Sequence, residues 1–226
     1  MFNADTSISE FIPFSSHVST SVIKTRDGDY LLSWHLEGLP FVGREEWEIE
    51  HRHNTFNRLL QTLRAPDFVN VAFWVHDVRR RRRISVKSQF RQRFNQEMSD
   101  AYYGALSSQK IMQNDLYLTM IYRPIVGSKR MMEKTAEHAR LKAEEEQAIG
   151  KLHELAGNVE AVIKDYSPYR LGMYEGANGV VFSETLEFLG YVLNRIEEPV
   201  PVLHAPIYNY LPVSRHMFSS KSGDFV

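Results

Sequence analysis

The chain has 226 residues, with 27 Lys and Arg against 28 Asp and Glu, and no cysteine. The absence of cysteine excludes disulfides, thiolate metal sites and thiol nucleophiles, and the near-neutral charge excludes a polycation built for nucleic acid or acidic membranes. Because no stretch approaches the ~20 apolar residues of a membrane span and the first residues do not resemble a signal peptide, we expect a cytosolic or peripheral protein.

The beginning of the chain predicts an arm followed by a β-hairpin. Residues 1–15 are polar and are expected to be extended. Residues 17–25 and 30–37 are rich in β-branched and aromatic side chains, and Asp27-Gly28 between them supplies the backbone angles of a tight turn. In the second strand one face is apolar, made of Tyr30, Leu32, Trp34 and Leu36.

A helix and a strand are expected next. Residues 44–63 predict a helix with one apolar stripe at Phe56, Leu59, Leu60 and Leu63. Residues 68–78 predict a strand that is apolar on both faces, which is typical of a central strand.

The one strong charge cluster follows this strand and consists of Arg79, Arg80, Arg81, Arg82 and Arg83. One interpretation is contact with nucleic acid or anionic lipid, because each phosphate contact adds affinity and salt sensitivity. The competing interpretation is a solvated junction between the strand and a helix over residues 87–106. An acidic patch on a protein partner is a third possibility.

A second cluster of candidate residues lies on a long helix. After a strand over residues 116–123, residues 129–165 predict a helix whose first half is polar and includes Glu144, Glu145 and Glu146. Its second half has an apolar face, so we expect that half to pack on the domain and the first half to be exposed to solvent or to face a partner. Charge reversal at the three glutamates is therefore expected to weaken partner binding.

The remaining segments complete an α+β fold. Residues 169–174 predict a short strand, Ser183 caps a further helix, and residues 200–211 predict an extended edge that is a second candidate contact surface. The order of elements predicts an antiparallel or mixed sheet with helices packed mainly on one face, plus one long, partly exposed helix. We expect this domain to span residues 16–218, with 219–226 starting a linker.

No motif for catalysis is found. The phosphate-loop pattern G-x-x-x-x-G-K-S/T is absent, and residues 220–223 lack its glycines and its strand-to-helix context. His51 and His53 are two residues apart on a predicted helix, so they point in opposite directions and cannot chelate one ion. We therefore predict no catalytic, cofactor-binding or metal-binding residue in this chain.

Several blocks, in this order, resemble the amino-terminal region of the VirB/TrbE/CagE family of type IV secretion ATPases. The blocks are HVS at 17–19, KTRDGDYL at 24–31, WHLEGLPF at 34–41, HNTFN at 53–57, NDLYLT at 114–119, IYRP at 121–124 and SETLEFL at 183–189. Together they cover nearly the whole chain.

The resemblance implies a non-catalytic assembly domain of a conjugation or secretion ATPase at the cytoplasmic face of the bacterial inner membrane. The implied partners are inner-membrane channel subunits and further copies of the ATPase, with membrane contact through those partners. The phosphate loop belongs to a carboxy-terminal RecA-like motor, so ATP and magnesium are expected there and not in this chain. The alternative function is a nucleic-acid-binding module that uses Arg79 to Arg83.

Overall fold

The computed structural model describes residues 8–38, 43–82, 89–107, 111–124 and 137–211. The elements in chain order are η1 (Ile8–Glu10), β1 (Phe14–His17), β2 (Ile23–Thr25), β3 (Tyr30–Leu36), α1 (Glu46–Thr62), η2 (Pro66–Phe68), β4 (Val71–Arg82), α2 (Arg93–Ser107), β5 (Ile111–Tyr122), α3 (Glu137–Ile163), η3 (Lys164–Tyr166), β6 (Pro168–Arg170), β7 (Met173–Glu175), β8 (Val181–Ser183), α4 (Glu184–Asn194) and α5 (Ile207–Tyr210).

The fold is α+β, built on an antiparallel six-stranded sheet, which confirms the predicted class. The strand order is β1-β2-β3-β5-β4, and β6 pairs with the carboxy-terminal half of β3. A separate two-stranded sheet is formed by β7 and β8. The strand β3 therefore lies in the middle of the main sheet.

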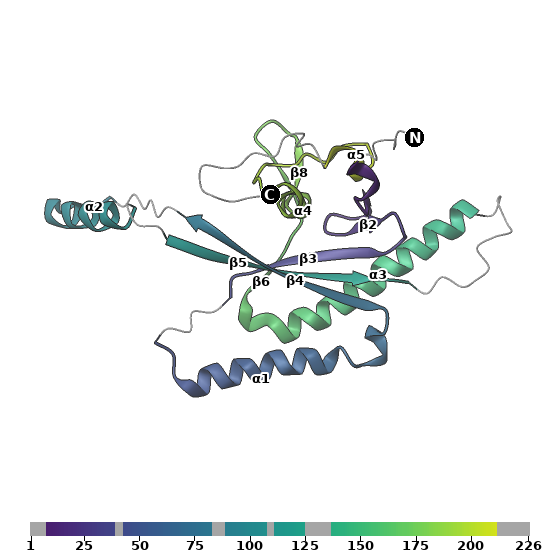
Figure 1. Ribbon diagram of the computed structural model, residues 1–226, viewed down its shortest axis with the longest axis horizontal. Helices are drawn as coiled ribbons and strands as arrows, with labels where there is room; N and C mark the ends of the chain where they lie inside the picture. Colours follow the sequence, from purple (N-terminus) through teal and green to yellow (C-terminus); the bar gives the residue numbers. More distant parts are fainter. Residues whose placement is uncertain (1–7, 39–42, 83–88, 108–110, 125–136, 212–226) are drawn as a thin grey trace, which may run out of the picture.

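One face of the sheet is covered by the two long helices α1 and α3 (Figure 1). The predicted apolar face of β3 points to them: Leu32 and Trp34 are fully buried. The predicted apolar face of α3 also packs here, through Leu152, Leu155 and Val159. The apolar face of β3, which repeats every two residues, thus packs in one core with the apolar face of α3, which repeats every 3.6 residues, as the sequence predicts.

The opposite face is covered by α4 and α5, so the sheet is enclosed on both sides (Figure 1). This second core contains Leu31 from β3 and Leu186 from α4. Ser183 caps α4 as predicted, because its hydroxyl accepts a hydrogen bond from the Leu186 amide at 3.2 Å. Ile12 and Phe14, both within the amino-terminal segment 1–15 that was expected to be extended, are buried in this core as well.

Three local predictions are wrong. Residues 17–25 do not form one strand, because the chain turns back on itself and the Val18 amide donates to the Val22 carbonyl at 3.0 Å. The strand β4 is an edge strand, since no strand pairs with its outer side within the described ranges. Residues 200–211 are not a continuous extended edge, because they contain α5.

Candidate interaction surface on the β4–β5 arm

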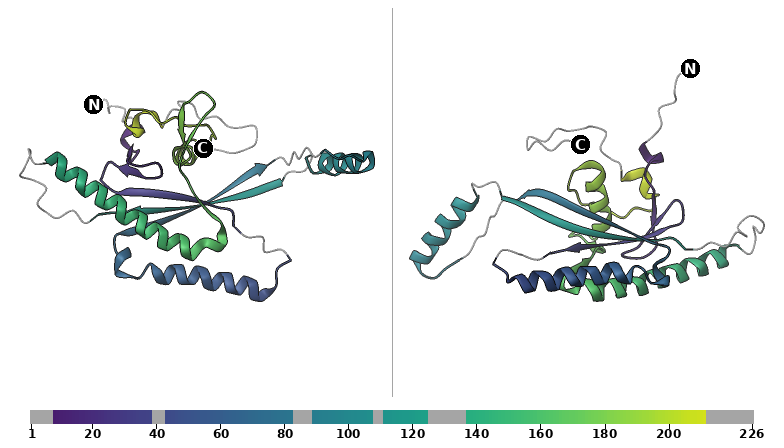
Figure 2. Two further views of the ribbon diagram at one scale, coloured as in Figure 1. Left: turned by 180° about the vertical axis from the view of Figure 1, so that it is seen from behind. Right: turned by 60° about the horizontal axis from the view of Figure 1, so that its bottom comes forward.

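The strands β4 and β5 extend beyond the rest of the sheet. The last pair between β3 and β5 is Leu36 with Leu116, whereas β4 and β5 remain paired from Val78–Asp115 to Arg82–Ile111. This two-stranded ribbon, together with α2 beyond it, is here called the arm. All views show α2 past the ends of β4 and β5, away from the helices that cover the sheet (Figures 1 and 2).

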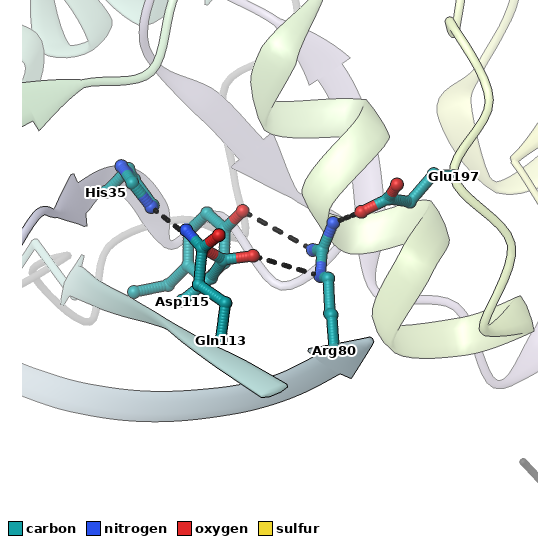
Figure 3. A network of polar contacts seen from close by, with 6 residues as sticks. His35, Arg80, Gln113, Asp115 and Glu197 are labelled. Carbon is teal, nitrogen blue, oxygen red and sulfur yellow. Dashed lines mark hydrogen bonds and ion pairs between the residues drawn. The ribbon is translucent and has the colours of Figure 1, made fainter. Parts of the chain in front are cut away.

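An ion pair lies at the base of the arm. The Arg80 Nε atom is 3.2 Å from the Asp115 carboxylate, which is almost completely buried. Gln113 donates a hydrogen bond of 2.9 Å to the same carboxylate, and His35 Nε2 lies 3.8 Å from it (Figure 3). A buried carboxylate needs such partners because an isolated buried charge is costly.

Arg80 also joins the arm to the segment that follows α4. Its guanidinium pairs with Glu197 (Figure 3) and lies 4.2 Å from the centre of the Tyr191 ring, within the range of a cation–π interaction. The segment reaches this position because α4 ends at Arg195, which takes a left-handed backbone conformation. We call the group of Arg80, Asp115 and Glu197 the clamp.

Aromatic rings pack beside the clamp. Tyr117 of β5 stacks on Phe188 of α4 with ring centroids 4.2 Å apart, and His76 of β4 meets the same ring edge-on at 5.3 Å. Burial lowers the pKa of His76, so this histidine is predominantly neutral at pH 7. The base of the arm is therefore held against α4 by apolar packing as well as by charge.

The arginine run is divided between the two faces of β4. Residues 79–82 lie in the strand itself, which therefore continues past its predicted end at residue 78. Successive side chains in a strand point to opposite faces, and accordingly Arg79 is exposed while Arg80 enters the clamp. The side chains of Arg81 and Arg82, and all of Arg83, lie outside the described residues.

The helix α2 presents an apolar stripe to solvent. Phe94 is 72% exposed, Met98 59% and Tyr102 61%, and no residue of α2 is buried. Singly exposed apolar residues are ordinary, but a contiguous apolar patch on a soluble protein marks an interaction site. The sequence shows this stripe at helical spacing but does not show that nothing covers it.

The three glutamates of α3 differ in their surroundings. Glu145 pairs with Lys24 of β2 at 2.7 Å and so attaches α3 to the sheet. Glu144 and Glu146 are exposed, and Glu146 lies 3.9 Å from Lys142 one turn earlier. Only part of the predicted cluster is therefore directed outward.

The described ranges contain neither a candidate metal site nor a candidate membrane span. In those residues no group of three or more His, Asp or Glu is arranged to hold a metal ion. No described helix is both long and apolar enough to cross a membrane.

Comparison with known proteins gives the class. Residues 21–129 match the family described as "Type IV secretion system ATPase VirB4/TrbE, N-terminal domain". The chain belongs to this family and carries its N-terminal domain, which confirms the resemblance drawn from the sequence blocks.

Individual relatives agree with this assignment. The chain is 34% identical to type IV secretion system protein virB4 of Brucella suis and 26% identical to type IV secretion system protein PtlC of Bordetella pertussis, over 92% of its length in each case. It is 25% identical to virB4 of Bartonella henselae over 94% of its length. The chain spans only 26–27% of these proteins, about a quarter of their length.

Sequence reasoning missed the partners of Arg80. Asp115 and Tyr117, whose hydroxyl accepts a hydrogen bond from the Arg80 guanidinium at 3.4 Å, lie in the NDLYLT block that carries the family resemblance, and that block was the available signal. The sequence does not indicate that Glu197 and Tyr191 lie near Arg80, because their approach to it depends on how α4 packs on the sheet.

Proposed function

We propose that this chain is the non-catalytic assembly domain of a VirB4-type secretion ATPase. It docks on inner-membrane channel subunits and on further copies of the ATPase, for transfer of DNA or protein and for pilus biogenesis. Residues 16–218 form the domain and 219–226 lead toward a RecA-like motor, which holds ATP and magnesium. The domain acts at the cytoplasmic face of the inner membrane, and its partners provide the membrane contact.

The observation that carries this proposal is the exposed apolar stripe of α2. A domain that needs only its own core would bury Phe94, Met98 and Tyr102, because each buried aromatic or methionine side chain contributes roughly 1.5–3 kcal/mol. The arm instead holds them away from both cores. Such a stripe is suited to the groove or helix of another protein.

The alternative of nucleic-acid binding has less support. Arg80 is engaged with Asp115 and Glu197 and is not available for phosphate. The charged residues of α2 pair within the helix, since Arg93 contacts Glu97 at 2.7 Å and Gln96 contacts Asp100 at 3.0 Å. Of the charged side chains described in the arm, Arg80, Arg93 and Asp100 have partners of their own, whereas Arg79 is exposed.

The test is binding to purified inner-membrane subunits of the same secretion system, held in detergent or nanodiscs. We expect the 226-residue chain to bind at least one subunit and the double variant Phe94→Gln/Met98→Gln to bind at least tenfold more weakly. Ser107→Gln, on the opposite side of α2, is the matched control and keeps full affinity. Wild-type chain that binds no subunit overturns the docking proposal.

A further inference from the structure

We infer that α2 pairs antiparallel with α2 of a second copy of this chain, an inference that rests on the self-assembly part of the proposed function. Phe94, Met98, Ala101 and Ala105 are spaced by four, three and four residues. This spacing is that of the seam of a two-helix coiled coil, in which each seam residue enters a gap between residues of the facing helix.

The seam is self-complementary in size only when the helices run in opposite directions. Its first half carries the large side chains of Phe94 and Met98, and its second half carries Ala101 and Ala105. A two-fold axis near the middle of α2 places Phe94 against Ala105 of the second copy and Met98 against Ala101. In a parallel pair, large would meet large and small would meet small, leaving a gap at one end.

Charge also favours the antiparallel direction. The described part of α2 has no basic residue in its last turn and no acidic residue in its first turn, so neither end of its helix dipole is compensated. Antiparallel pairing brings Arg93, whose side chain is 91% exposed, to the negative carboxy-terminal end of the second copy.

The size of the seam determines the strength of the pair. A helix of 15 residues is roughly 22 Å long, so two copies bury less than the ~1,200 Å² of a standard interface. The isolated chain should therefore dimerise weakly and with clear dependence on concentration. Many copies held side by side in one assembly would gain from effective concentration what each contact lacks in area.

The arm makes this contact sterically accessible. The ribbon places α2 beyond both layers of helices, so two copies can join at their tips without a collision between their cores (Figures 1 and 2). A two-fold contact of this kind is closed, because each copy uses the same surface.

The test is disulfide trapping in the 226-residue chain, which has no cysteine of its own. Phe94→Cys and Ala105→Cys are prepared as separate variants, and the oxidised species are separated by mass after incubation alone or together. We expect a covalent dimer chiefly in the mixture, because antiparallel pairing brings position 94 to position 105 and separates like positions by roughly 16 Å along the helix axis, beyond the ~7 Å that a disulfide spans. Ser107→Cys, on the opposite side of α2, is the control for random collision.

Sedimentation over a concentration series completes the test. We expect a dimer whose dissociation constant rises at least tenfold in Phe94→Gln/Met98→Gln, with circular dichroism of the body unchanged. Each cysteine variant trapping chiefly with itself overturns the antiparallel geometry. If Phe94→Gln/Met98→Gln dimerises as strongly as the wild type, self-assembly uses another surface and the inference alone is overturned. If the wild-type chain binds lipid vesicles and the double variant does not, the inference is overturned in favour of a membrane surface.

A chain that is monomeric at every concentration overturns the inference while leaving docking to the inner-membrane subunits intact. That docking is measured separately, as described above, so failure of the inference and failure of the docking proposal are distinguishable.

Discussion

The Arg80 guanidinium and the Asp115 carboxylate lie 3.2 Å apart at the point where the β4–β5 ribbon leaves the sheet. Both residues point to the side of the sheet on which α4 packs, and Glu197 meets the same guanidinium from the segment after that helix. The clamp therefore joins the root of the arm to the body of the domain.

Removing the arginine of the clamp is expected to destabilise the domain. Arg80→Met leaves the buried Asp115 carboxylate without its main countercharge, which costs about 3–5 kcal/mol. The matched control is Arg79→Met, because that neighbouring side chain is exposed and its loss should change stability by no more than about 0.5 kcal/mol. Urea denaturation of both variants measures the difference, and equal stabilities would show that the clamp contributes nothing.

A buried hydrogen bond between β3 and β5 gives a coupled pair of variants. The hydroxyls of Ser33 and Thr119 lie 2.8 Å apart and both residues are fully buried. Ser33→Ala or Thr119→Val alone leaves one hydroxyl without this partner and is expected to cost about 1–2 kcal/mol. The double variant should cost less than the sum of the two by about 1 kcal/mol. Strict additivity in chemical denaturation would disprove the coupling.

Stability is expected to fall in acid because of His17. Burial lowers the pKa of His17 to about 4, whereas in the unfolded chain it is near 6.5. The unfolded state therefore binds the extra proton between these values, and stability decreases as the pH falls from 6.5 toward 4. The loss between pH 7 and pH 5 should be at most about 2 kcal/mol.

The variant His17→Gln isolates this contribution. His76 and His153 also have pKa values lowered by burial, so wild-type protein should lose further stability with the same sign. Denaturation midpoints at pH 5, 6 and 7 should therefore show a shallower slope in His17→Gln than in the wild type. Identical slopes would show that His17 is not protonated differently on folding.

The glutamates of α3 require separate variants. Glu145→Lys places two cations together at Lys24 and is expected to cost up to about 1 kcal/mol, with recovery in Lys24→Glu/Glu145→Lys. Glu146→Lys changes an exposed side chain, so it tests partner binding without loosening α3. Weaker binding to inner-membrane subunits with unchanged stability would support the prediction that the first half of α3 faces a partner, and unchanged binding would discard it.

The sequence predicted well those elements whose signal is local. The helix α1 was expected over 44–63 and occupies Glu46–Thr62, and the apolar face in the second half of α3 packs as its periodicity indicates. The cap at Ser183 was correct because the hydroxyl and the amide it serves are three residues apart. Periodicity and capping are properties of short segments, so one sequence is enough to find them.

The arm could not be predicted in this way. Whether β4 is central or at an edge depends on which strand pairs with it, and an apolar run is the same in both cases. The sequence leaves the arginine run open between a solvated junction and a contact with phosphate or an acidic partner, because Arg80 meets Glu197 only after α4 has packed on the sheet. The family resemblance supplied the assignment that periodicity could not.

The central pairing of β3 with β5 has a consequence for the accuracy of folding. Leu32 and Trp34 face Met120 and Leu118 toward one core, while Leu31 faces Ile121 toward the other. A slip of one residue between these strands would exchange the contents of both cores at once and would separate Ser33 from Thr119. A shifted register is thus destabilised by lost packing on both sides of the same sheet, so the correct alignment of β3 with β5 is strongly favoured as the domain folds.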